Sequence, residues 1–101
     1  MPKIVPFEDP TNYWRAIKRI RKLWQEGNVT WIPHAEEQMR VRGIDLTDVA
    51  HLIRYGRIVN HSRPVELWRY EIKGKMVDGG QAKCVVEIDG ALIIITLFEL
   101  V

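Results

Sequence analysis

The stretch HAEEQMRVRGIDLTDVAHLIRYG, residues 34–56, decides the fold, because it predicts two short helices joined at a glycine. Pro33 suits the first helical position, where its missing N–H costs nothing, and Gly43 supplies the left-handed residue that ends the first helix. Asp45 is a strong N-cap for the second helix, and Asp48 stands three residues on, as in a capping box. Apolar residues then follow at the i, i+3, i+4, i+7 spacing of an amphipathic helix: Leu46, Val49, Ala50 and Ile53.

The first of these helices places polar residues beside its apolar face. At about 100° per residue, Ala35, Met39 and Arg42 share one face. His34 and Gln38 extend a polar stripe along the edge of that face as far as Arg42. An arginine next to an apolar seam needs an anionic neighbour, so either a carboxylate or an anionic ligand is expected there.

The composition describes one domain, residues 1–101, with 47% hydrophobic and 28% charged residues, as is usual for a soluble protein. The net charge of +2 permits a nucleic-acid partner without requiring one. The single cysteine, Cys84, excludes an internal disulfide and fits a reducing compartment. No secretory leader is visible at the start, and the longest apolar run, 91–98, is too short to span a bilayer. We therefore expect a cytoplasmic protein with no membrane partner.

Residues 10–27 predict a basic N-terminal helix that begins with Asp9 as N-cap and Pro10 at the first position. Its buried stripe is predicted to contain Tyr13, Ile17, Ile20 and Trp24, widened by Trp14 and Leu23. The opposite side carries four cations: Arg15, Lys18, Arg19 and Lys22. Two interpretations stay open for these cations, a solvated face or a face directed at phosphates or at a partner protein.

Residues 57–99 predict an antiparallel meander of three or four strands, because the hydrophobic period changes from 3.6 to 2 after the second short helix. Residues 28–32 are either an extended link or a strand at the sheet edge. In the strand around residue 70, Trp68, Tyr70 and Ile72 share one face, and Leu67, Arg69, Glu71 and Lys73 share the other. We therefore predict an α+β fold with the N-terminal helices, including the pair at 33–56, on one face of the sheet.

Asp89-Gly90 predicts a two-residue turn between the last two strands. That turn pairs apolar residues on the core face: Ile88 with Ala91, Val86 with Ile93, Cys84 with Ile95, and Ala82 with Leu97. It pairs a mixed set on the other face: Glu87 with Leu92, Val85 with Ile94, Lys83 with Thr96, and Gln81 with Phe98. A hairpin with this pattern has its register fixed by the apolar face.

A histidine, several cations and a hydroxyl on one surface suit a phosphodiester substrate. The candidates come from three places in the chain. His34 and Arg42 lie on the first short helix, and Arg69, Lys83 and Thr96 lie on the mixed sheet face. Arg63 and His61 lie on the loop between the helices and the sheet. RNA cleavage needs no metal, because the 2′-hydroxyl is the nucleophile and the protein supplies an acid, a base and cations. His34 and Arg42 are eight residues apart, so about 12 Å of helix axis separates their backbones.

Less specific roles remain open for the same residues. His34 could satisfy a local hydrogen bond at the helix start, and Arg42 could pair with Glu87 or Glu71. His51 is expected to be exposed, and His61 has no visible partner in the sequence. The three histidines lack metal-ligand spacing, and Cys84 lies on a core face, so neither a metal, a cofactor nor a thiol nucleophile is expected. A helix-turn-helix over 34–55 is disfavoured by the acidic start of its second helix.

The motif His34-Ala35-x-x-x-Met39-x-x-Arg42-Gly43-Ile44, followed by Asp48-Val49 and a closing Gly56, resembles a family of small bacterial domains of unknown function that look like RelE-type toxin ribonucleases. The resemblance covers residues 30–98. It implies helices packed on a curved antiparallel sheet, with RNA bound between helix and sheet. Carried over by position, His34, Arg42, Thr96 and Tyr70 are the implied catalytic residues. This sequence departs from the pattern at Pro33, where a polar cap is usual, and at Gln38, where an arginine or an acid is common.

The leading hypothesis is therefore a metal-independent endoribonuclease of a toxin–antitoxin pair. His34 would act as general acid or base, and Thr96 would orient the scissile group. The RNA-binding residues would be Arg69, Lys83, Arg63, Arg15, Lys18, Arg19 and Lys22. The expected partners are messenger RNA, free or on the ribosome, and a cognate antitoxin protein. The alternative is a non-catalytic module that binds nucleic acid or another protein.

Overall fold

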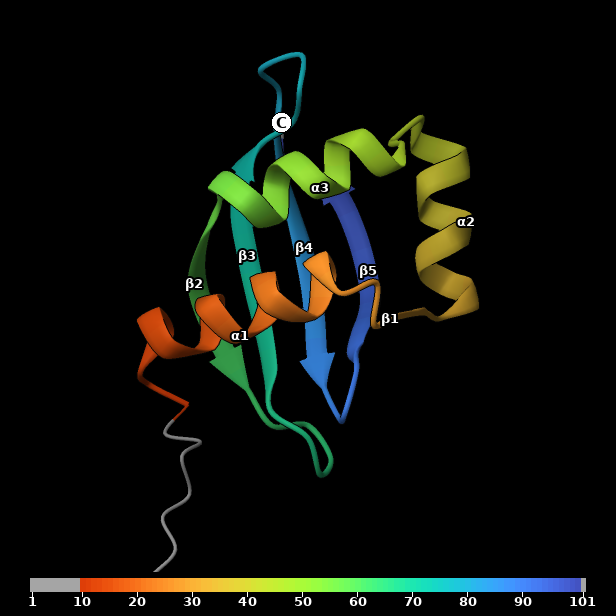
Figure 1. Cartoon of the computed structure of the whole chain (residues 1–101). Coiled ribbons are helices and arrows are strands. Elements are labelled where there is room, and N and C mark those ends of the chain that lie inside the picture. The colour runs from red at the N-terminus through yellow and green to blue at the C-terminus, as the bar shows by residue number, and fades with distance from the viewer. Residues whose placement is uncertain (1–9, 101) are drawn as a thin grey trace, which may run out of the picture.

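The computed structural model describes residues 10–100, which form three helices and five strands (Figure 1). In chain order these are α1 (Tyr13–Gln25), β1 (Val29–Trp31), α2 (Pro33–Arg42), α3 (Leu46–Tyr55), β2 (Arg57–Ser62), β3 (Arg69–Lys75), β4 (Gln81–Ile88) and β5 (Leu92–Glu99). The α+β class is therefore confirmed, and the pair of short helices has the predicted bounds to within a residue.

The five strands form one mixed sheet in the order β1-β5-β4-β3-β2. β2 to β5 make the predicted antiparallel meander, whereas β1 runs parallel to β5, with Thr30 opposite Ile93. The prediction of a purely antiparallel sheet with three or four strands is thus wrong. The fifth strand forms because the link after α1 lies along the sheet edge, where its backbone pairs with Leu92 and Ile94.

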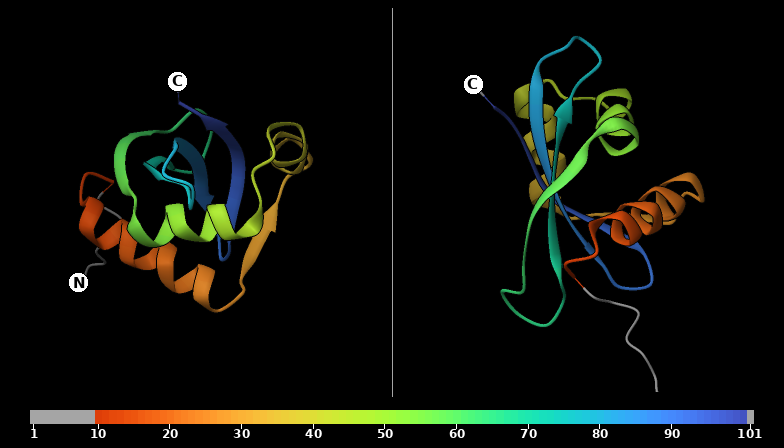
Figure 2. Two further views of the ribbon diagram at one scale, coloured as in Figure 1. Left: turned by 90° about the horizontal axis from the view of Figure 1, so that it is seen from above. Right: turned by 90° about the vertical axis from the view of Figure 1, so that its left-hand side faces the viewer.

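The helices do not all cover the same part of the sheet. α1 and α3 lie across one face, whereas α2 stands at the edge formed by β1 and β5 (Figures 1 and 2). α2 is fixed there by Ala35, which is fully buried in the core. The sheet face opposite α1 and α3 is here called the open sheet face, and it carries Arg69, Glu71, Lys73, Lys83, Val85, Glu87 and Thr96.

The helix ends follow local capping chemistry. α1 begins later than predicted, at Tyr13, because the side chain of Asn12 accepts a hydrogen bond from the Arg15 backbone N–H at 3.1 Å and acts as N-cap. The predicted N-cap, Asp9, lies outside the described residues, and α1 ends at Gln25 rather than at residue 27. α2 ends at Gly43, whose φ is +69°, and Asp45 and Asp48 form the predicted capping box of α3.

The core lies between the sheet and the inner sides of α1 and α3. α1 buries Ala16, Ile17 and Ile20, with Trp24 packed beside them. Trp14 was predicted to widen this stripe, but its side chain is 69% exposed because it lies on the outer side of the helix, next to Lys18. Trp68 packs against the core as expected.

The register of the β4–β5 hairpin differs from the prediction. Val86 pairs with Ile94 and Cys84 with Leu97, so the core face of β5 consists of Leu92, Ile94 and Leu97. The turn has three residues, 89–91, closed by a bond from the Asp89 N–H to the Ala91 carbonyl, and this shifts the strand by one position. The register shifts again opposite Val85 and Val86, where Ile95 is an extra residue on β5. The core face of β4, with Ala82, Cys84 and Val86, was predicted correctly.

A second irregularity lies in β2, at the opposite edge of the sheet. Ile58 pairs with Ile72 and Asn60 with Glu71, so Val59 is the extra residue of a bulge. After the bulge, His61 pairs with Tyr70 and lies on the core side of the sheet, facing α1. The bulge therefore decides which β2 side chains reach the helices.

Candidate nucleic-acid interface

α2 presents His34 and Arg42 at its two ends, and both residues are exposed. Pro33 starts the helix, so His34 is in its first turn, and Arg42 is its last residue. The Arg42 Nε donates to the Gln38 side-chain oxygen at 2.7 Å, one turn earlier in the helix. The interpretation of Arg42 as the partner of Glu87 or Glu71 is thus wrong, because those two carboxylates are bound to other cations.

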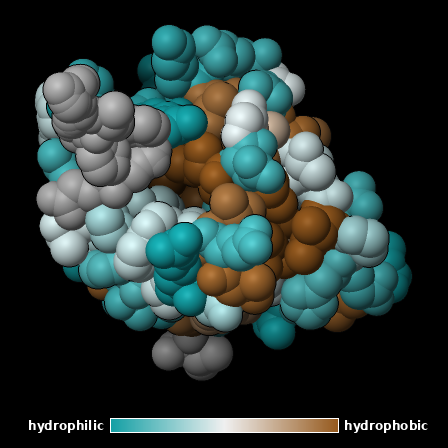
Figure 3. Space-filling model, turned by 90° about the horizontal axis from the view of Figure 1, so that it is seen from below, coloured by the Kyte–Doolittle hydropathy of each residue, from teal (hydrophilic) through white to brown (hydrophobic). Residues whose placement is uncertain are grey.

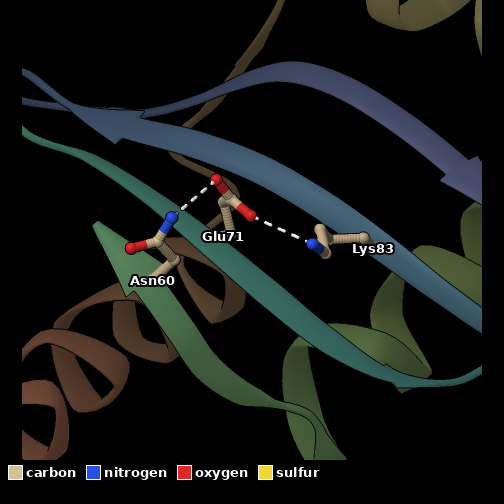
Figure 4. A network of polar contacts seen from close by, with 3 residues as sticks. All are labelled: Asn60, Glu71 and Lys83. Atoms are coloured by element: carbon tan, nitrogen blue, oxygen red, sulfur yellow. Dashed lines mark hydrogen bonds and ion pairs between the residues drawn. The ribbon is translucent and has the colours of Figure 1, made fainter. Parts of the chain in front are cut away.

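On the open sheet face, the cations predicted to contact phosphate are paired with acids. An Arg69 guanidinium nitrogen lies 2.8 Å from a Glu87 carboxylate oxygen. The Lys83 Nζ lies 3.1 Å from one oxygen of Glu71, whose other oxygen accepts from Asn60 at 3.3 Å (Figure 4). Both ion pairs are half-buried, and in each pair the carboxylate neutralises the charge of the cation.

Thr96 and Tyr70, the other two predicted catalytic residues, lie on opposite faces of the sheet. Thr96 is opposite Val85 and belongs to the open sheet face. Tyr70 is opposite Val86 and is only 6% exposed, on the side covered by α1. The structure therefore brings Arg69, Lys83 and Thr96 to one surface and places Tyr70 on the other.

α1 carries an exposed cationic surface, here called the α1 cationic face, which consists of Trp14, Arg15, Lys18, Arg19 and Lys22. The Lys18 Nζ lies 4.3 Å from the centre of the Trp14 ring, a cation–π contact at an exposed site. The helix itself contains no acidic residue. This combination of adjacent cations with an accessible aromatic ring is the pattern that single-stranded nucleic acids bind.

Arg21 is a fifth cation of α1, and its role is different. Its Nε donates to the Ile53 carbonyl at 2.8 Å and a terminal nitrogen donates to the Gly56 carbonyl at 2.9 Å. These carbonyls belong to the C-terminal end of α3, where the helix dipole favours a positive charge. Arg21 therefore joins α1 to α3, a role that its position between basic neighbours in the sequence did not reveal.

His61 also has a partner that sequence analysis missed. Its Nδ1 and the Tyr13 hydroxyl are 2.6 Å apart, and its ring contacts Trp68 at a centroid distance of 5.7 Å. The Arg63 guanidinium lies 5.6 Å from the centre of the Trp68 ring. The residues are up to 55 positions apart along the chain, so no local pattern could have brought them together.

A hollow of about 340 Å³ lies between α1 and the start of β3. Its walls include Arg15 and Arg19 from the α1 cationic face and the aromatic side chains of Trp68 and Tyr70. Two further hollows lie beside α3, and neither His34 nor Arg42 lines any of the three. The hollow thus lies beside the α1 cationic face and away from α2, and its lining combines these aromatic rings with two acidic residues, Glu66 and Asp89.

The end of the molecule that lies at the bottom of Figure 1 exposes apolar side chains. Seen from below, apolar side chains form a band bordered by hydrophilic residues (Figure 3). The loop between β2 and β3 lies at this end, and its Val65 is 80% exposed. The surface of the protein therefore includes an exposed apolar region in addition to the α1 cationic face.

The chemistry of Cys84 agrees with its predicted burial. The side chain is fully buried, and burial raises the pKa of its thiol to about 12, because a thiolate is poorly solvated there. Within residues 10–100, no three His, Cys, Asp or Glu side chains are grouped so that they could hold a metal ion. None of the helices in that range is long and apolar enough to cross a membrane.

A family model described as a domain of unknown function, DUF4258, matches residues 31–99. The match includes β2 to β5 and both short helices, takes in only Trp31 of β1, and leaves out α1. The chain belongs to the DUF4258 family. No curated protein and no solved structure matches the chain significantly. The α1 cationic face is thus an N-terminal element outside the family domain.

Proposed function

We propose that this protein binds single-stranded RNA through the α1 cationic face and cleaves it as a metal-independent endoribonuclease of the toxin type. The observation that carries the binding step is the exposure of Arg15, Lys18 and Lys22 beside Trp14, on a helix without acidic residues. Cations supply the affinity for phosphates, and the indole offers a face on which a base can stack.

The cleavage step rests on the two exposed residues of α2. His34 would transfer a proton, and Arg42 would stabilise the charge that develops on the phosphate. Both side chains are accessible, and a swing of Arg42 away from Gln38 would free its guanidinium for an anion. The proposed partners are messenger RNA, free or on the ribosome, and a cognate antitoxin protein that would block the toxin.

The test of binding is a fluorescence titration of a labelled single-stranded RNA at several salt concentrations. Three to four phosphate contacts should give a slope of about −2 to −3 in a plot of log K against log salt. Absence of salt-dependent binding would contradict the proposal at its first step.

The test of cleavage is incubation of messenger RNA with the protein in the presence of a chelator. His34→Ala and Arg42→Ala should each slow cleavage by at least about 100-fold, the usual effect of losing one acid–base or charge-stabilising group. Arg40→Gln is the matched control, because Arg40 is an exposed cation of the same helix that pairs with Glu37. Binding without cleavage in the unmodified protein would favour the non-catalytic nucleic-acid module, and equal cleavage by all variants would exclude the α2 site.

A further inference from the structure

A second hollow, of about 390 Å³, lies at the end of α3, beside the start of β2 and the last residues of β3, away from α1 and α2. It is lined by His51 and Tyr55 from α3, Arg57 from β2, Lys73, Gly74 and Lys75 from β3, and Gln81 from β4. No acidic residue is among these lining residues. The volume falls within the range of about 300–1,000 Å³ that small-molecule sites occupy.

The three cations of this hollow are not neutralised by the ion pairs that the structure describes. Within residues 10–100, those pairs join Arg40 to Glu37, Arg69 to Glu87 and Lys83 to Glu71. Arg57 and Lys73 are opposite one another on β2 and β3, so their like charges are held close by the register. Like charges held directly opposite each other repel, and an anion between them would remove that cost.

His51 has its ring held in one orientation. It was predicted to be exposed, but its side chain is half-buried, and its Nδ1 lies 2.8 Å from the Lys75 carbonyl oxygen. Since a carbonyl oxygen can only accept, Nδ1 carries the proton of this bond. In the neutral ring, Nε2 is then the remaining acceptor, and it suits a hydroxyl donor such as that of a ribose.

An exposed aromatic ring stands beside these polar groups. Tyr55 is 66% exposed, and its ring centroid lies 4.8 Å from that of His51. The Arg54 guanidinium approaches the same ring at 5.6 Å. A ring that is held by neighbours and still open to solvent offers a face on which a base can stack.

Two glycines hold this end of α3 against β3. A Cβ atom on Gly74 would stand 2.8 Å from the Gly56 Cα, and one on Gly56 would stand 2.4 Å from the Leu52 carbonyl oxygen. The φ of Gly56 is −77°, so close packing, rather than a left-handed backbone, requires glycine there. The hollow is therefore built on a close helix–strand contact that fixes its lining residues relative to one another.

We infer that this hollow binds one nucleotide of a single-stranded RNA. The phosphate lies against Arg57, Lys73 and Lys75, a ribose hydroxyl donates to His51 Nε2, and the base stacks on Tyr55. The inference rests on the proposed RNA binding and names a second place where the RNA is held. It is distinct from the α1 cationic face, because none of the residues that line it belongs to α1.

The experiment is an NMR titration of the full-length protein, labelled with ¹⁵N, with 5′-AMP, adenosine and inorganic phosphate in parallel. 5′-AMP should shift the amide signals of residues 51–57 and 73–75 in a saturable way, and should bind more tightly than either fragment. Lys73→Gln combined with Lys75→Gln should weaken 5′-AMP binding by about 10-fold or more, because charge-assisted bonds to the phosphate are lost. Tyr55→Leu should weaken 5′-AMP by about 5-fold or more and leave inorganic phosphate unchanged.

Arg40→Gln serves as the control cation, and thermal unfolding verifies that each variant is folded. Unchanged 5′-AMP binding in the lysine double variant overturns the inference. Equal affinity for 5′-AMP and inorganic phosphate, with no effect of Tyr55→Leu, also overturns it and identifies a site for free phosphate. If RNA binds but 5′-AMP leaves the hollow unperturbed, this inference fails and the proposed function stands. If 5′-AMP binds as described but RNA does not, the nucleotide site stands and the proposed function fails.

Discussion

The α1 cationic face and the open sheet face contain the same kinds of cation, but they differ in the acidic residues that surround these cations. On α1, the side chains of Arg15, Lys18 and Lys22 lie together on a helix that has no acidic residue. On the open sheet face, Arg69 and Lys83 each have a carboxylate within 3.1 Å. A count of basic residues treats the two surfaces alike, although Arg69 and Lys83 are each paired with a carboxylate and Arg15, Lys18 and Lys22 have none on their own helix.

The difference arises because a sheet and a helix place different residues beside each cation. In the sheet, the register places Glu87 directly opposite Arg69 and Glu71 diagonally opposite Lys83. Such cross-strand pairs are the sheet's own source of stabilisation. Along α1, no residue three or four positions away from Arg15 or Lys18 is acidic, and Glu26, four positions after Lys22, comes after the helix has ended.

The largest effect is expected from removing charge on α1. The triple variant Arg15→Gln, Lys18→Gln, Lys22→Gln should lower RNA affinity by about 100-fold at low salt and flatten the salt dependence, because about three phosphate contacts are lost. The matched variant Arg69→Gln with Lys83→Gln should change RNA affinity by less than about 3-fold, since those charges are already compensated. Equal losses in the two variants would remove the distinction between the surfaces.

Within α1, Arg21 differs from the cations of the α1 cationic face because its charge binds backbone carbonyls at the end of α3. Arg21→Met should lower the free energy of unfolding by about 2 kcal/mol, because two charge-assisted hydrogen bonds to backbone carbonyls are lost. A fall of about 8–16 °C in the melting temperature should accompany this loss in a domain of this size. Lys22→Met, at the neighbouring exposed position, is the control and should leave the melting temperature nearly unchanged. An Arg21 variant as stable as this control would show that the link between α1 and α3 contributes nothing.

A smaller effect is expected from the ion pair between Arg69 and Glu87. Arg69→Gln should destabilise the fold by about 1 kcal/mol, because the Glu87 side chain, only 13% exposed, is left without its cation. Adding Glu87→Gln should recover most of that loss, and denaturant unfolding of the two single variants and the double variant measures the coupling. Additive losses would mean that the pair is a coincidence of packing, in which case the charge of Arg69 is free for a ligand.

Local chemistry made much of this fold predictable from the sequence. Pro33, Gly43 and the Asp45–Asp48 box act within a few residues of themselves, so the bounds of α2 and α3 could be predicted. The β4–β5 register could not, because the choice between a two- and a three-residue turn at Asp89-Gly90 is small in energy and the bulge at Ile95 is decided by packing. Trp14 was misplaced for a related reason: it borders the apolar stripe, and only the direction from which the sheet covers α1 decides its exposure.

The candidate sites were harder to predict than the fold. His34 and Arg42 are both exposed, although helix geometry placed Arg42 on the same face as Ala35 and Met39. Alternation along β3 correctly separated Tyr70 from Arg69. The partners of His61 and Arg21 come from positions more than 30 residues away, so they depend on the completed packing. The same is true of the hollow at His51, whose lining comes from four elements.

The two outer strands of the sheet have a consequence for how the domain behaves at high concentration. β1 has only three residues, and β2 is interrupted by its bulge at Val59. Neither offers a long, regular row of unpaired backbone groups onto which another chain could add a strand. We therefore expect the described domain to resist self-association by edge-to-edge strand pairing, which would keep a small, sheet-rich protein from templating its own aggregation.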